Sequence, residues 1–259
     1  MFWKRKKEKE KTPEERLQFL LSSSPELIAA SLAALKAPEF ENNTHHLAMV
    51  WSNLVYNYAA YAIHLWRSGA DPSGEVAKMH AAYRDMIDFL DRNSGQEVRN
   101  MALYPWDIVY TLAYLNGTPE EPRFSWANDD FREEPSEYDT LSRSLTQRLL
   151  GLDGWEAPPP AGPGKRVIAQ SFPLYHAILD IGADTPEVEP LVRELEKLWE
   201  TRAEHASQFH KVPGLLGGGV ATDLDVDVHL AGVLHAIDWS GDSIHKWKPE
   251  WSAGERKPL

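Results

Sequence analysis

Apolar residues recur along most of this chain at three- and four-residue steps, the spacing of one face of an α-helix. The clearest case lies between Thr44 and Arg67, with Leu47, Val50, Trp51, Leu54, Tyr58, Tyr61 and Leu65 on one stripe. Similar patterns, bounded by proline, glycine or asparagine, predict further helices over residues 72–93, 106–115, 141–150, 167–181, 186–210 and 226–239. No alternating run is long enough to predict a sheet, so we expect an all-α protein.

Two helix-start signals lie close together near the beginning of the chain. Thr12 precedes Pro13, and Ser24 precedes Pro25, with glutamates following in both cases. A hydroxyl residue at the N-cap, proline at the first helical position and carboxylates in the first turn are typical of a helix N-terminus. We therefore predict two helices here, the second over residues 27–36.

Short turns between these helices predict layered antiparallel helical hairpins. The Pro/Gly-rich run within residues 156–164 cannot hold a helix and is the best candidate boundary, between an N-terminal helical subdomain (1–155) and a C-terminal one (165–259) in one compact body. Gly-Ala-Asp follows a helix at both 69–71 and 182–184. This similarity indicates either two related subdomains or the ordinary chemistry of helix ends.

Composition narrows the class of partner. The chain has 259 residues, of which 42% are hydrophobic, no cysteine and a net charge of −12. Such a charge disfavours nucleic acid and suits either solubility or a basic partner protein. The basic cluster Lys4–Lys7 is followed by lysines interleaved with Glu8 and Glu10. We interpret this segment as the solvated start of a helix. Without a recognisable signal peptide or membrane span, we expect a cytoplasmic protein with no membrane partner.

Three aspartates, Asp223, Asp225 and Asp227, follow a triple-glycine loop at 217–219. A calcium-binding EF-hand would need glycine and glutamate where Val228 and Leu234 stand, so calcium is disfavoured. Three interpretations stay open, namely helix-capping carboxylates, contacts to a partner, and a metal site.

Two other acidic segments are candidate partner contacts. One is the irregular stretch that holds Asp129, Asp130, Glu133 and Glu134. The other is the acidic and aromatic C-terminal tail, with Asp238, Trp239 and Asp242, which either contacts a partner or packs onto the body. The chain lacks Gly-x-Ser-x-Gly, His-Glu-x-x-His and a phosphate-binding Gly-x-x-x-x-Gly-Lys motif. The common signatures of hydrolases and of phosphate-binding loops are therefore absent.

The order of several elements resembles a known family. The first half has a helix that ends at Ser68-Gly69 and then a tyrosine-bearing helix over 75–90. The second half has a helix with the pattern Leu195-x-x-x-Trp199, the glycine loop, an acidic helix over 223–232 and the tail 238–251. This order is similar to that of the two-part, all-α immunity proteins of bacterial polymorphic toxins. The resemblance is to those paired with nuclease effectors of the polymorphic nuclease effector (PoNe) type, delivered by type VI secretion.

The resemblance implies a stoichiometric inhibitor in the bacterial cytoplasm, with no enzyme activity, no cofactor and no bound metal. It would bind and neutralise a cognate toxin, expected to be a nuclease effector, by occluding its active site or substrate-binding face. The acidic residues named above would supply the electrostatic contacts to a basic nuclease. The alternatives are a metal-dependent helical enzyme that uses the carboxylates around Asp223–Asp227, and a helical protein-binding adaptor.

Overall fold

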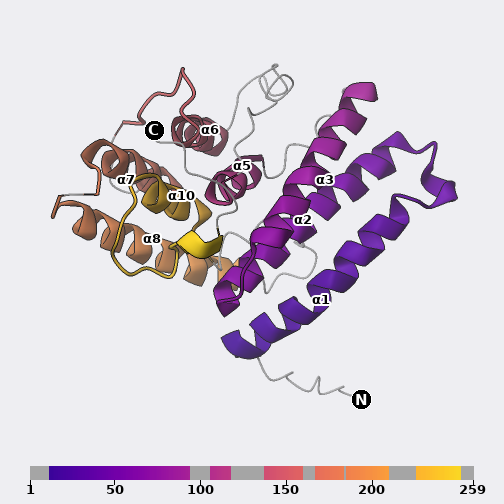
Figure 1. The fold of residues 1–259 in the computed structure, drawn as a ribbon, viewed down its shortest axis with the longest axis horizontal. Helices are drawn as coiled ribbons and strands as arrows, with labels where there is room; N and C mark the ends of the chain where they lie inside the picture. The colour runs from indigo at the N-terminus through magenta and orange to yellow at the C-terminus, as the bar shows by residue number, and fades with distance from the viewer. Residues whose placement is uncertain are drawn as a thin grey trace, which may run out of the picture.

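The computed structural model describes residues 12–93, 106–117, 137–159, 167–183, 185–209 and 226–251. These residues form eight α-helices and two short 3-10 helices and contain no strand, which confirms the all-α prediction (Figure 1). The helices are α1 (Pro13–Ala34), α2 (Thr44–Ser68), α3 (Ser73–Arg92), α5 (Trp106–Leu115), α6 (Glu137–Leu149), α7 (Val167–Ile181), α8 (Val188–Phe209) and α10 (Val228–Ala236), with 3-10 turns at Pro38–Phe40 and Pro249–Trp251.

Helix α1 is one continuous helix, so the prediction of two helices in this region is wrong. The first start signal acts as expected, because Thr12 and Glu15 form a reciprocal capping box. Pro25 lies inside the helix and cannot donate a backbone hydrogen bond. The Ser24 hydroxyl donates to the Leu20 carbonyl at 2.7 Å. The helix packs along α2, where Ile28 is buried. Packing against α2 thus keeps α1 continuous through the second helix-start signal.

Helices α2 and α3 begin and end close to their predicted positions. Asn43 caps α2 by accepting a hydrogen bond from the His46 backbone N–H at 3.0 Å. Gly69 ends the helix with a φ of 81°, a left-handed conformation that glycine adopts without steric cost. Ala70 N–H then bonds the Leu65 carbonyl, so α2 stops sharply and α3 can pack back against it (Figure 1).

Two groups of buried side chains form the core. The first is built by α2, α3 and α5 together with Trp247 and Trp251. The second is built by α6, α7, α8 and α10 together with Trp239. Helix α6 precedes residues 156–164 yet belongs to the second group, and the two C-terminal tryptophans belong to the first. The cores therefore do not separate at the Pro/Gly-rich run.

The segment after α10 folds back onto the body. Trp239, Trp247 and Trp251 are all buried. The Trp247 ring meets the ring of Trp66 from α2 edge-on at 5.1 Å between centroids. At Gly241 a Cβ atom would lie 2.3 Å from the Trp239 ring, so only glycine allows this close approach. The tail was expected either to contact a partner or to pack onto the body, and these three tryptophans pack onto the body.

Candidate functional site

The candidate contact residues from the sequence fall into three groups. Asp223, Asp225, Asp129, Asp130, Glu133 and Glu134 lie outside the described residues. Asp238 and Asp242 are exposed on the C-terminal segment. Asp227 and Trp239 are only 6% exposed, which corrects their expected place on a partner surface.

Asp227 is a structural residue at the start of α10. One carboxylate oxygen accepts the Leu230 backbone N–H at 2.9 Å, and the other accepts the Tyr175 hydroxyl at 2.6 Å. This is the N-cap interpretation of the aspartate cluster, and it is confirmed for Asp227. Since this carboxylate is buried and each oxygen accepts a hydrogen bond inside the protein, it offers no surface contact to a partner.

A second buried polar pair ties α10 to α5. His229 Nε2 lies 3.1 Å from Asp107 Oδ2, and the two side chains are 7% and 5% exposed. The rings of Phe172 and Tyr175 from α7 lie beside the imidazole. A histidine–carboxylate pair can serve catalysis, but both of these residues are buried between helices. We interpret the pair as a satisfied core contact between helices.

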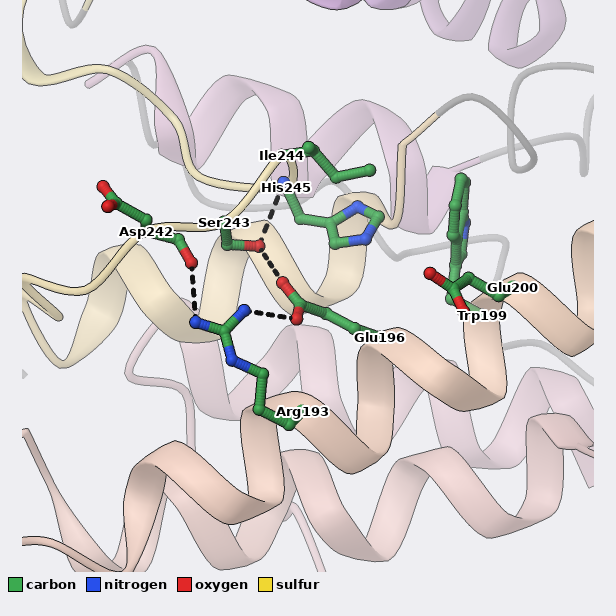
Figure 2. Close-up of a pocket in the computed structure, with 8 residues that line it drawn as sticks. All are labelled: Arg193, Glu196, Trp199, Glu200, Asp242, Ser243, Ile244 and His245. Atoms are coloured by element: carbon green, nitrogen blue, oxygen red, sulfur yellow. Dashed lines mark hydrogen bonds and ion pairs between the residues drawn. The ribbon is translucent and has the colours of Figure 1, made fainter.

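An open groove forms where α8 meets the C-terminal segment, with a volume of about 410 Å³ (Figure 2). We call it the α8 groove. It is lined on one side by residues of α8 and on the other by four consecutive residues after α10, namely Arg193, Glu196, Trp199, Glu200, Asp242, Ser243, Ile244 and His245. The helical spacing of three and four residues puts the α8 side chains on one face.

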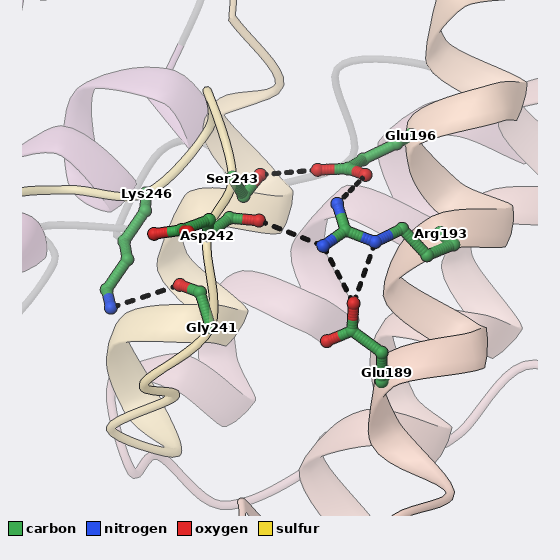
Figure 3. Close-up of polar contacts among 7 residues, drawn as sticks. All are labelled: Glu189, Arg193, Glu196, Gly241, Asp242, Ser243 and Lys246. Atoms are coloured by element: carbon green, nitrogen blue, oxygen red, sulfur yellow. Dashed lines mark hydrogen bonds and ion pairs between the residues drawn. The ribbon is translucent and has the colours of Figure 1, made fainter.

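One part of the α8 groove is held together by ion pairs and hydrogen bonds (Figure 3). The Arg193 guanidinium bonds Glu189 and Glu196 on its own helix, and it donates to the Asp242 backbone carbonyl at 3.2 Å. The Ser243 hydroxyl donates to Glu196 at 2.7 Å. The hydrogen bonds that Arg193 donates to Glu196 and Glu189 raise its pKa. These contacts fix the C-terminal segment against α8 and shape the groove.

The other part of the α8 groove is open and acidic. The carboxylates of Glu200 and Asp242 make no hydrogen bond or ion pair with any described residue, and both residues are exposed. Glu189 and Glu196 pair with the Arg193 guanidinium, and Glu200 and Asp242 add two further acidic residues to the groove lining. The side chain of Ile244, which is 54% exposed, and the half-buried Trp199 ring provide apolar surface along the same groove. The field here therefore favours a cation.

His245 lies at the base of the α8 groove and is fully buried. Its Nδ1 accepts the Asp227 backbone N–H at 2.9 Å, which places the ring proton on Nε2. Nε2 has no hydrogen-bond partner among the described residues, and the ring meets Trp199 edge-on at 4.7 Å between centroids (Figure 2). Burial lowers the pKa of His245 below its usual value, so this residue is neutral at pH 7.

The α8 groove contains serine, histidine and glutamate, but they do not form a nucleophilic triad. A triad needs the imidazole to take the serine proton. Here the Ser243 hydroxyl donates to Glu196, and His245 contacts that hydroxyl only through its backbone N–H at 3.2 Å. Within the described residues no group of three or more His, Asp or Glu side chains is placed to hold a metal ion. The geometry is that of a binding surface.

Sequence reasoning found Asp242 but missed the α8 side of this groove. Arg193, Glu196 and Glu200 recur at three- and four-residue steps, a visible signal of one charged helix face. In an acidic chain such a face is ordinary, so nothing in the sequence marked it out. What makes it a groove is the return of residues 242–245 along α8, a tertiary contact. No protein-family model, no curated protein and no solved structure matches this chain.

Proposed function

We propose that this protein is a bacterial immunity protein, which binds a cognate toxin, a nuclease effector, and occludes its active or substrate-binding face. The observation that carries the proposal is the α8 groove, where the exposed carboxylates of Glu200 and Asp242 pair with no described residue and share the lining with Trp199 and Ile244. The family resemblance in the order of elements and the net charge of −12 support the same function.

The chemistry of the α8 groove suits a lysine or arginine side chain of a partner. The aliphatic stem of such a residue packs against Ile244, and its charged end reaches the Glu200 carboxylate and the ring of Trp199. Proteins that bind nucleic acid present lysine and arginine on the face that contacts phosphates. A surface that captures those residues competes directly with the nucleic acid, so inhibition requires no chemistry from the inhibitor.

The test uses genes encoded next to this one. Each neighbouring gene is expressed alone in a bacterial host, and one whose product stops growth is then co-expressed with this chain. We expect full rescue by the wild-type chain and a one-to-one complex whose affinity falls as salt rises, because exposed charge pairs are screened. The proposal is overturned if this chain fails to restore growth with every toxic product of a neighbouring gene.

A charge reversal in the α8 groove tests the surface itself. Glu200→Lys is expected to weaken the complex by about tenfold or more and to reduce its salt dependence. Asp85→Lys makes the same change of charge at an exposed position of α3 and serves as the matched control. If both variants bind like the wild type while rescue persists, another surface holds the toxin.

A further inference from the structure

The α8 groove has an acidic residue at each of its two ends. At one end lies Asp242, whose backbone carbonyl accepts a hydrogen bond from Arg193 at 3.2 Å, and at the other lies Glu200. Glu200 follows Arg193 by seven residues of α8, so the two ends are about 10 Å apart along the helix axis. In Figure 2 the Asp242 and Glu200 side chains lie on opposite sides of Glu196. One small cation therefore cannot contact both ends.

The wall between the two ends is fixed in place. After the contact of Asp242 with Arg193, the Ser243 hydroxyl donates to Glu196 at 2.7 Å, so the C-terminal segment follows α8 from one helical turn to the next. The backbone N–H of His245 then donates to the Ser243 hydroxyl at 3.2 Å. These bonds make the groove a preformed, elongated site, which suits an elongated ligand.

At the base of the α8 groove lies a hydrogen-bond donor without an acceptor. His245 is fully buried, and its Nδ1 accepts the Asp227 backbone N–H, so the ring proton is on Nε2. No described residue accepts a hydrogen bond from this Nε2. Figure 2 shows the imidazole directed into the space between the C-terminal segment and α8. Because buried donors in folded proteins are nearly always paired, this one points to a ligand that supplies an oxygen atom.

We infer that the α8 groove binds an extended basic segment of the partner, with two lysine or arginine side chains at its acidic ends and a main-chain carbonyl on His245 Nε2–H. This inference rests on the proposed function, in which the segment belongs to the toxin. One cationic side chain pairs with Asp242, and the other pairs with Glu200 while its stem packs on Ile244. A helix uses its carbonyls internally, whereas an extended segment leaves one for the histidine.

A short stretch of extended chain reaches both ends. Such a chain advances about 3.3 Å per residue, and its side chains alternate between two faces. Basic residues two or four positions apart therefore share a face, and their flexible stems adjust to a span of about 10 Å. Since His245 Nε2 is itself covered, a carbonyl reaches it only after a lining side chain turns aside. Ile244, which is 54% exposed, is an apolar lining residue with room to do so.

Synthetic peptides test the groove without the toxin. The probe is a short acetylated and amidated glycine peptide that carries two lysines four positions apart and a leucine midway between them. Its binding to the full chain is followed by NMR with isotope-labelled histidine. We expect binding that weakens as salt rises, and a downfield shift of the His245 Nε2 proton as the carbonyl accepts it. The same peptide with one lysine replaced by glutamine is expected to bind about two- to fivefold more weakly. No binding, or binding that leaves the His245 signal in place, overturns the inference.

Neutral substitutions locate the bound peptide at the two ends of the groove. Glu200→Gln and Asp242→Asn are each expected to weaken binding of the two-lysine peptide about two- to fivefold. Glu194→Gln removes an exposed carboxylate of α8 that does not line the groove, and we expect it to leave binding unchanged. If Glu194→Gln weakens binding as much as the two groove variants do, the general negative charge of the chain attracts the peptide, and the inference is wrong.

Two further comparisons separate the possible outcomes. Spermidine is cationic but has no carbonyl, so it is expected to leave the His245 Nε2 signal in place; an equal shift with spermidine would make the groove a polyamine site and overturn the inference. If the chain neutralises a toxin and neither Glu200→Gln nor Asp242→Asn weakens that complex, the inference fails while the proposed function stands. If the peptide binds as expected but no toxic neighbouring product is neutralised, the proposed function fails and the preference of the groove for a basic segment stands.

Discussion

His176 on α7 makes the stability of this protein depend on pH near neutrality. Its Nδ1 lies 3.2 Å from the Arg148 guanidinium, which also donates to the His176 backbone carbonyl and pairs with Asp180. The Trp155 ring covers both residues, with Arg148 4.3 Å from its centroid. Burial, and then the charge of Arg148, lower the pKa of His176 from 6.5 to about 4, while Asp180 acts in the opposite direction.

The direction of the effect follows from which state binds the proton. Between pH 6.5 and about 4 the unfolded chain protonates this histidine and the folded chain does not. The free energy of unfolding therefore falls as the pH falls through this window. With a pKa of about 4 in the folded state and about 6.5 in the unfolded state, the contribution of this residue falls by about 2 kcal/mol between pH 7.5 and 5.0.

Urea unfolding at pH 7.5 and at pH 5.0 measures this contribution, and most aspartates and glutamates stay ionised over that range. His176→Gln removes the titrating group, so we expect the variant to lose about 2 kcal/mol less than the wild type between the two pH values. The wild type and an exposed control, His45→Gln, are expected to show the same pH dependence. A variant that loses as much stability as the wild type would show that this histidine is protonated readily in the folded protein. The pKa of His245 is lowered in the same direction, so this residue accounts for part of the pH dependence that remains in the His176→Gln variant.

Two further predictions concern the contacts around α10. Tyr175→Phe leaves one buried oxygen of Asp227 without its donor and is expected to cost about 1.5–3 kcal/mol in urea unfolding. A loss no larger than that of Tyr61→Phe on α2 would contradict this. Gly232→Ala would place a Cβ 2.8 Å from Leu149 Cδ1, so overpacking is expected to exceed the gain in helix propensity and lower stability by about 1 kcal/mol. A more stable variant would show that the Leu149 side chain can move aside.

Most of the helices could be predicted from the sequence because their signals are local. The apolar stripe of α2 and its glycine stop needed only helical spacing and the left-handed preference of Gly69. The same local reasoning failed at Pro25, where a start signal lies inside a helix. Whether a proline ends a helix depends on how firmly both sides are packed, and here α2 supports the whole length of α1.

The functional surface depended on contacts that no local pattern shows. Asp227 and Asp242 look alike in the sequence, yet one caps a buried helix and the other borders an open groove. The burial of Trp239 and the exposure of Phe19 likewise depend on which elements pack beside them. The sequence by itself determined the helical class, most helix ends and the acidic charge, because those follow from spacing, caps and composition. Only the tertiary structure decided which carboxylates and apolar side chains are exposed at the surface, because burial depends on how the whole chain packs and not on the residue type.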